Sequence, residues 1–239
     1  MTFQISNSFR RPSMQKNTLF RLSSIPLLCV LLFSCGTHQR IGEGEFKKLF
    51  NGQNLDGWVG DKQSYTAKNG MIVVDPDGEG SGGNLYTAEE YSDFVFRFEF
   101  LLTPGGNNGL GIHAPLGGNT AYEGKELQII DNTATKYANL KPYQYHGSVY
   151  GIIPAKRGFL RPVGEWNEQE VTVKGSKIIV VLNGTTIVDG DFIEASKNGT
   201  MDKKEHPGLQ RNRGHIAFLG HGDVVHFRNI RIKDLSSKY

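Results

Sequence analysis

A run of alternating phenylalanines constrains the fold of this chain more than any other feature. Between Asp93 and Leu102 the sequence reads "DFVFRFEFLL", with phenylalanine at every second position from Phe94 to Phe100. The positions between them carry valine, arginine and glutamate. A period of two places all four rings on one face of an extended strand and the intervening side chains on the other. The run therefore predicts a β-strand with one face in a hydrophobic core.

Other short runs of the same kind follow along the chain. We predict further strands at residues 70–75, 107–113, 125–131, 147–153, 169–175, 176–184, 185–190, 214–220 and 224–233. Turn signals separate them, and Asn183-Gly184 is typical of a type I′ hairpin turn. Only short segments, such as "TAEEYSDF" at residues 87–94, are expected to form one or two helical turns. Residues 193–214 are expected to form a long polar loop.

About ten antiparallel strands in about 200 residues favour an all-β fold. We predict a two-sheet antiparallel sandwich, with Greek-key or jelly-roll connections. If one sheet is curved, its concave face would suit a sugar chain.

The first 35 residues are typical of an export signal. Four basic residues and no acidic ones precede the apolar run "IPLLCVLLFSC". That run is shorter than the roughly 20 residues that a membrane span needs. The sequence Leu32-Phe33-Ser34-Cys35 resembles a bacterial lipobox and predicts lipidation of Cys35, although a plain secretory peptide or an uncleaved anchor would also fit. We expect residues 36–45 to be a tether and residues 46–239 to be one sandwich domain, lipid-anchored in the cell envelope on its periplasmic or surface side.

Charge and cysteine content narrow the function of the remaining chain. The formal charge of the whole chain is +3, but its excess of positive charge comes from the signal. Residues 36–239 carry 23 basic and 24 acidic side chains, a net charge of −1. Nothing then indicates a nucleic-acid partner, since such proteins carry clustered basic residues. Both cysteines, Cys29 and Cys35, lie in the signal. The domain is therefore expected to depend on its core rather than on a disulfide.

The strand at residues 125–131 carries the first candidate site residues. Alternation places Glu126 and Gln128 on one side and Leu127 and Ile129 on the other, with Asp131 at the end. The apolar pair belongs in the core, so the carboxylate and the amide face outward. The alternative is that this strand shows an ordinary polar face to water.

The preceding strand supports a groove on that outer side. Its apolar residues at positions 110 and 112 would point inward, which leaves Gly109, Gly111 and His113 on the outer face. Glycines allow a ligand to approach the backbone closely. Tyr150 is expected on the same outer side.

Seven short motifs follow one another along the chain: "LFNGQNLDGW", "NNGLGIH", "ELQIIDN", "GSVYGI", "GEWN", "VLNG" and "HGDVVHFRNIRIKDL". In this order they resemble the 3-keto-disaccharide hydrolase domain family of the concanavalin A-like lectin and glucanase superfamily. The resemblance implies a jelly-roll sandwich that hydrolyses glycosides with a ketone at carbon 3. One departure from the family pattern is Leu219-Gly220 before His221, where a glutamine and a polar residue are common.

Two mechanisms would leave different residues in the sequence. Related sandwich glucanases place two acids four residues apart on one strand, but the residue four after Glu126 is Ile130. A 3-keto sugar needs one base, one stabiliser of the enolate and one acid. We assign Glu126 or a nearby histidine as the base, Arg228 as the stabiliser and His221 as the acid. Direct hydrolysis through an oxocarbenium-like state is the alternative.

Further residues are candidates for contacts with the sugar. Gln128, His113, Tyr150 and Asp131 are expected to bind substrate, and Trp166 could stack on a sugar ring. A divalent metal held by Glu126, His113 and His221 would polarise the ketone, but no tight ligand spacing indicates such a site. The rival to an enzyme is a non-catalytic carbohydrate-binding module on the same sandwich.

Overall fold

Two antiparallel β-sheets packed face to face make up the protein. The computed structural model describes residues 46–74 and 82–236, so the predicted signal, the tether and Cys35 lie outside the described residues. The larger sheet has the order β11 (Thr185–Asp191), β10 (Lys177–Leu182), β9 (Trp166–Lys174), β6 (Phe94–Leu102), β13 (Val225–Asp234), β4 (Met71–Val74) and β3 (Tyr65–Lys68), with β1 (Lys47–Lys48) added beside β13. The smaller sheet has the order β2 (Trp58–Gly60), β5 (Asn84–Tyr91), β12 (Gly214–Gly220), β7 (Asn107–Ala114) and β8 (Lys125–Ile130). The predicted all-β, two-sheet fold is confirmed.

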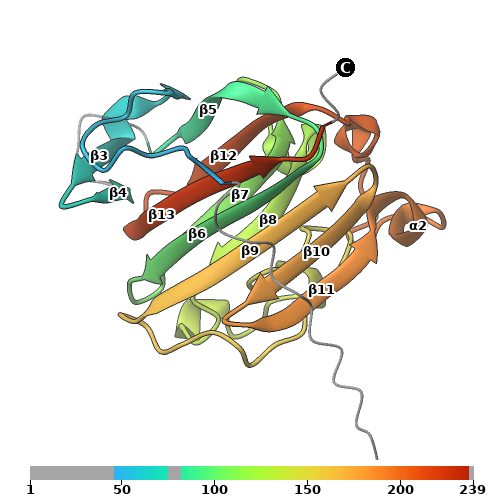
Figure 1. The fold of residues 1–239 in the computed structure, drawn as a ribbon. Helices are drawn as coiled ribbons and strands as arrows, with labels where there is room; N and C mark the ends of the chain where they lie inside the picture. The colour runs from blue at the N-terminus through green and yellow to red at the C-terminus, as the bar shows by residue number, and fades with distance from the viewer. Residues whose placement is uncertain (1–45, 75–81, 237–239) are drawn as a thin grey trace, which may run out of the picture. The chain divides into compact units, whose positions relative to one another are not determined.

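The core lies between these two sheets. All four alternating phenylalanines of β6 are fully buried, and Phe98 meets Phe218 of the smaller sheet with ring centroids 6.0 Å apart. Phe218 also stacks on Phe227 at 3.9 Å and on Trp58 at 5.5 Å. Figure 1 shows β6, β9, β10, β11 and β13 in front of β7, β8 and β12. The period of two in the sequence therefore marks the face that joins the sheets.

The turn between β10 and β11 also has the conformation that the sequence predicts. Asn183 and Gly184 both have positive φ, +48° and +85°, as a type I′ turn requires. They connect β10 to β11 as predicted. In β13 the pairing with β6 shifts between Arg228 and Arg231, and Asn229 has a φ of +51°. This bulge bends the strand near its middle.

Two predicted elements are wrong. Thr87–Tyr91, expected to be helical, is the second half of β5, which pairs on both sides with β2 and β12. Residues 147–153, expected to be a strand, form turns with isolated bridges, because Gly147 and Gly151 have φ values of +79° and +74°. This segment still covers the free edge of β8, since the Tyr150 N–H donates to the Glu126 carbonyl at 2.9 Å.

Short helices and loops complete the domain. They are α1 (Thr120–Glu123), η2 (Lys62–Ser64), η3 (Thr135–Tyr137), η4 (Pro142–Gln144), α2 (Phe192–Ser196) and η5 (Pro207–Gln210). The predicted polar loop at residues 193–214 thus contains most of α2 and all of η5. No helix in residues 46–74 and 82–236 is long and apolar enough to cross a membrane.

Candidate active site

Glu126 projects from the outer side of the smaller sheet. Its strand neighbours Leu127 and Ile129 are completely buried in the core, as the alternation predicts. Glu126 and Gln128 are themselves only 6% exposed, because other segments pack over β8. The alternative of an ordinary strand face open to water is therefore wrong.

Gly109 makes the space that the Glu126 side chain occupies. A Cβ at Gly109 would lie 2.9 Å from the carboxyl carbon of Glu126 and still closer to its Oε1. Gly109 thus allows a close approach to its backbone, as expected, but the group that approaches is a carboxylate of the protein and not a ligand. Oε1 is buried and has no hydrogen-bond partner among the described residues. A buried carboxylate oxygen without a donor is unfavourable, which is typical of a group kept for chemistry rather than for stability.

His221 is the nearest basic side chain to this carboxylate in the structure. Its Nε2 lies 3.9 Å from Glu126 Oε1, beyond hydrogen-bond distance, and its side chain is 45% exposed. Glu126 and His221 both line two adjoining hollows of about 370 and 290 Å³. The structure thus brings together the two residues that the sequence proposed as base and acid, and both line the same hollows.

Amide and phenol groups surround the larger hollow. Gln128 Nε2 donates to Asn107 Oδ1 at 2.9 Å, and Gln144 Nε2 lies 3.4 Å from the Tyr150 hydroxyl. All four side chains line the hollow. Burial raises the pKa of Tyr150, and the neighbouring Glu126 adds to the rise. The hydroxyl therefore stays protonated and can donate a hydrogen bond to a sugar oxygen.

Arg228 and Trp166 lie elsewhere, which corrects two assignments. Both belong to the larger sheet, on β13 and β9, and not to the sheet that carries Glu126. Arg228 Nε donates to Glu99 Oε2 at 2.7 Å, and its guanidinium lies 3.8 Å from the centre of the Trp166 ring. Arg228 thus contacts both Glu99 and Trp166, and the Trp166 ring is covered by the guanidinium of Arg228. Neither is available to a ligand beside Glu126.

His113 is not a groove residue, because β7 contains a bulge. Opposite β12, the pairing passes from Ala114 to Gly111 while the partner strand advances by only two residues, and His113 has a φ of +51°. The extra residue turns the ring inward. There its Nε2 lies 2.7 Å from the Ser92 carbonyl and its Nδ1 lies 3.1 Å from Lys125 Nζ. The strict alternation used in the sequence analysis fails at this position.

Asp131 braces a turn and is absent from the residues that line the two hollows. It accepts hydrogen bonds from the Gly105 N–H at 2.8 Å, the Thr133 N–H at 2.9 Å and the Thr133 hydroxyl at 2.6 Å. Although burial opposes the effect, these bonds lower the pKa of the carboxyl group. The sequence analysis expected Asp131 to contact substrate, whereas these bonds support a role in bracing the turn.

The three residues considered for a metal do not converge. His113 faces the core, whereas Glu126 and His221 face the hollows. No group of three or more histidine, cysteine, aspartate or glutamate side chains in the described part of the chain is arranged to hold an ion. No step below is assigned to a metal.

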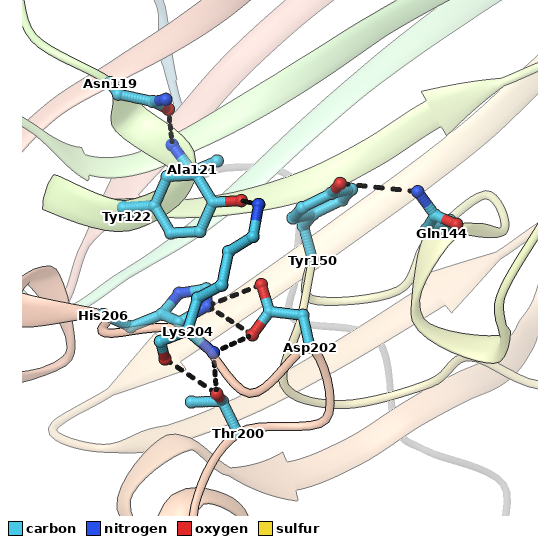
Figure 2. Close-up of polar contacts among 9 residues, drawn as sticks. All are labelled: Asn119, Ala121, Tyr122, Gln144, Tyr150, Thr200, Asp202, Lys204 and His206. Atoms are coloured by element: carbon cyan, nitrogen blue, oxygen red, sulfur yellow. Dashed lines mark hydrogen bonds and ion pairs between the residues drawn. The ribbon is translucent and has the colours of Figure 1, made fainter.

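A polar cluster beside the larger hollow was not predicted from the sequence. Tyr122, which lines the hollow, accepts a hydrogen bond from Lys204 Nζ at 2.9 Å. Behind it the His206 ring lies 4.8 Å from the Tyr122 ring, and His206 Nε2 lies 3.1 Å from both carboxylate oxygens of Asp202 (Figure 2). Residues 200–206 were expected to be an ordinary polar loop. Only the lysine, histidine and aspartate in that loop could have suggested more.

The fold and site define a class of carbohydrate-active β-sandwich. A solved structure of a candidate glycosyl hydrolase from Parabacteroides distasonis matches 80% of this chain and 99% of its own, with a TM-score of 0.70 and 26% identity. A carbohydrate-binding module from Bacillus subtilis, CBM66, shares the fold with a TM-score of 0.50 at 13% identity, covering 74% of this chain and 96% of its own. The predicted jelly-roll class is therefore confirmed.

The family is more specific than the fold. The model of the 3-keto-alpha-glucoside-1,2-lyase-like domain family matches residues 45–233, so the chain belongs to that family. A 3-keto-disaccharide hydrolase from Bacteroides thetaiotaomicron is 27% identical in an alignment over 224 residues that covers 78% of this chain and 77% of the relative. The resemblance read from the sequence motifs is confirmed.

Proposed function

We propose that this protein is an enzyme that cleaves the glycosidic bonds of 3-keto-glycosides, including 3-keto-disaccharides. The family and the relative from Bacteroides thetaiotaomicron support this substrate class. The observation that carries the proposal is the buried carboxylate of Glu126, whose Oε1 has no hydrogen-bond partner among the described residues and lies 3.9 Å from His221 Nε2. This arrangement supplies a base and an acid at the wall of one hollow.

The first half of the reaction is an elimination. The ketone at carbon 3 acidifies the hydrogen on carbon 2, and Glu126 takes that proton. The electron pair of the broken C–H bond forms a double bond between carbons 2 and 3, and the carbonyl pair moves to oxygen as an enolate. When the carbonyl re-forms, a double bond appears between carbons 1 and 2. The bond from carbon 1 to the departing oxygen breaks, and that oxygen takes a proton from His221.

Hydration completes the reaction. Water adds its hydroxyl to carbon 1, and its remaining proton goes to His221. Glu126 returns a proton to carbon 2. The sum is hydrolysis, with both side chains restored. The word lyase in the name of the family supports a route through elimination.

A two-carboxylate glycosidase is disfavoured around Glu126. Retaining and inverting enzymes need a second carboxyl group roughly 5 to 9.5 Å from the first. Ile130 occupies the position four residues after Glu126. The next acid along the chain, Asp131, is held by Gly105 and Thr133.

Turnover of a 3-keto-glucoside, compared with the parent glucoside, tests the function. We expect products from the keto substrate only, and a loss of about 10²–10⁴-fold in kcat for Glu126→Gln. The matched control is Glu165→Gln, at an exposed glutamate before β9, which should keep wild-type rates. Binding of both sugars without turnover would instead indicate a carbohydrate-binding module.

Solvent deuterium distinguishes elimination from direct hydrolysis. In D₂O, elimination and hydration place deuterium on carbon 2 of the product, whereas direct hydrolysis through an oxocarbenium-like state leaves the original hydrogen there. Free product incubated with heat-inactivated protein measures spontaneous exchange. A product without enzyme-dependent deuterium would contradict the elimination route.

We further propose that the enzyme is exported and anchored to the cell envelope by lipid on Cys35. The support is the sequence alone: a basic segment, an apolar run and Leu32-Phe33-Ser34-Cys35. Cys35→Ser should move the protein from the membrane fraction to the soluble fraction and abolish labelling with a radioactive fatty acid. Unchanged fractionation would contradict a lipid anchor at this position.

A further inference from the structure

The proposed reaction passes through an enolate, and the expected stabiliser, Arg228, lies on the other sheet. Two lysines instead contact phenol rings that line the larger hollow. Lys136 Nζ lies 5.0 Å from the centre of the Tyr137 ring and 3.3 Å from Asp223 Oδ2, so a carboxylate offsets its charge. Lys204 Nζ donates directly to the hydroxyl of Tyr122 at 2.9 Å. Lys204 therefore contacts the hydroxyl group of Tyr122, a side chain that lines the larger hollow.

Resting on the function proposed above, we propose that Tyr122 donates its hydroxyl hydrogen to the oxygen on carbon 3 and stabilises the enolate, with Lys204 as its positioning and polarising partner. The Tyr122 oxygen accepts from the ammonium group, which directs the hydroxyl hydrogen elsewhere. A hydroxyl that accepts a hydrogen bond from a cation is a stronger donor in its turn.

The position of Tyr122 fits this role. It lies on α1, three residues before β8 begins and four before Glu126, and both side chains line the same hollow. Tyr150 lies within electrostatic range of both, since each contributes to raising its pKa after the larger effect of burial. A base and a hydrogen-bond donor thus occupy one wall segment, as removal of a proton beside a ketone requires.

The loop that carries Lys204 is fixed by a chain of contacts. The Met201 N–H donates to the Gly151 carbonyl at 2.7 Å, and a Cβ at Gly151 would lie 2.7 Å from Asp202 Oδ2. The Lys204 N–H donates to Asp202 Oδ1 and to the Thr200 hydroxyl, each at 3.1 Å. Figure 2 shows the two contacts of the Lys204 N–H, below Tyr122 in the view. The loop therefore docks beside Tyr150 through the glycine of the "SVYGI" motif.

The charge on Lys204 persists at neutral pH. Its hydrogen bond to Tyr122 raises the pKa of the ammonium group. The buried pair of His206 and Asp202, with side chains 0% and 4% exposed, packs against the other side of Tyr122. These residues hold the ring and the loop and are assigned no contact with the sugar.

Steady-state rates on a 3-keto-glucoside test the inference. Tyr122→Phe removes one donor to the enolate and should lower kcat by about 10²–10³-fold, with a small effect on KM. Lys204→Gln should lower kcat by about tenfold, and Lys204→Arg should stay within about threefold of wild type because it keeps the charge and a donor. Lys203→Gln is the matched control at the neighbouring exposed lysine and should be silent.

The isotope effect of deuterium on carbon 2 separates this role from a structural one. If Tyr122 stabilises the enolate, Tyr122→Phe makes proton removal more rate-limiting, so the isotope effect on kcat should rise while the folded fraction stays that of wild type. His221→Asn slows departure of the leaving oxygen instead, so the isotope effect should fall. A purely structural role would lower the folded fraction without moving the isotope effect.

The two proposals fail in different ways. Wild-type protein without turnover of any 3-keto-glycoside would overturn the function and this inference together. Wild-type turnover, with kcat of Tyr122→Phe within about twofold of wild type, would overturn the inference alone. Equal losses for Lys204→Arg and Lys204→Gln would remove the polarising role of Lys204.

Discussion

At the scale of single residues, Glu126 departs from what ordinary strand chemistry provides. A carboxylate on the outer face of an antiparallel sheet normally faces water, but this one is 6% exposed and its Oε1 has no hydrogen-bond partner among the described residues. Alternation with Leu127 could predict which side of the strand Glu126 takes. It could not predict the burial, because the cover comes from segments distant in sequence.

The burial of Glu126 leads to a prediction about stability. Glu126→Gln keeps the shape of the side chain and removes a buried charge, so the free energy of unfolding should stay unchanged or rise by about 1 kcal/mol. Leu127→Ala, the neighbouring control, should lower it by about 2–5 kcal/mol through a core cavity. Urea denaturation of the two variants measures both. A loss of more than about 1 kcal/mol for Glu126→Gln would make the carboxylate a structural partner.

At the scale of elements, β7 shapes the site because it has no side chain at Gly109. Gly109 lies across from Gln128 in the pairing with β8, and the absent side chain leaves room for the Glu126 carboxyl group. One bulge further along β7 turns His113 into the core. The strand thus contributes an opening to the site and a buried histidine to the core.

Gly109→Ala should therefore impair activity through Glu126. Its Cβ would displace the carboxyl group, and a misplacement of about 1 Å can cost about 10²-fold in rate. The double variant Gly109→Ala with Glu126→Gln should be no slower than Glu126→Gln alone, because both changes act on one carboxylate. If the losses in kcat/KM of the two single variants multiply in the double variant, Gly109 acts by another route.

The same elements show how much of the fold could be predicted from the sequence. The alternation in β6 and the Asn183-Gly184 turn are local signals, and both held. The helical prediction for Thr87–Tyr91 failed because pairing with β12 at Glu90 and Tyr91, and with β2 at Thr87, outweighs the local preference. The bulge at His113 and the docking of Lys204 on Tyr122 depend on contacts between segments far apart in the chain. Sequence motifs therefore identified the family and proposed Glu126 and His221 as site residues, while the surroundings of these two residues could be described only from the fold.

At the scale of the whole molecule, the sandwich keeps its site outside its core. Glu126 and His221 line hollows on the outer face of the smaller sheet, whereas two other histidines are built into the interior. His113 packs against the edge of Phe94 with ring centroids 6.1 Å apart, and His146 stacks on Phe100 at 5.0 Å. Histidines in the interior couple the stability of the whole domain to pH.

The stability of the domain should fall as the pH drops from about 6.5 toward 5. Burial lowers the pKa of His146 to about 4, with a bond to Gln169 opposing, and burial together with Lys125 lowers the pKa of His113 to about 4. Both pKa values lie below the roughly 6.5 of an unfolded histidine. Between these values the unfolded chain binds more protons than the folded protein, so the free energy of unfolding decreases with falling pH.

Each of these histidines should contribute about 1.4 kcal/mol per pH unit within that window. Protonation of His146 would also place a second N–H where its buried Nδ1 has no partner among the described residues. His146→Gln should therefore flatten the dependence by about one proton, as measured by urea denaturation between pH 5 and 6.5, above the range in which most carboxylates titrate. A slope that stays the same in His146→Gln would mean that this ring is protonated in the folded protein as readily as in the unfolded chain.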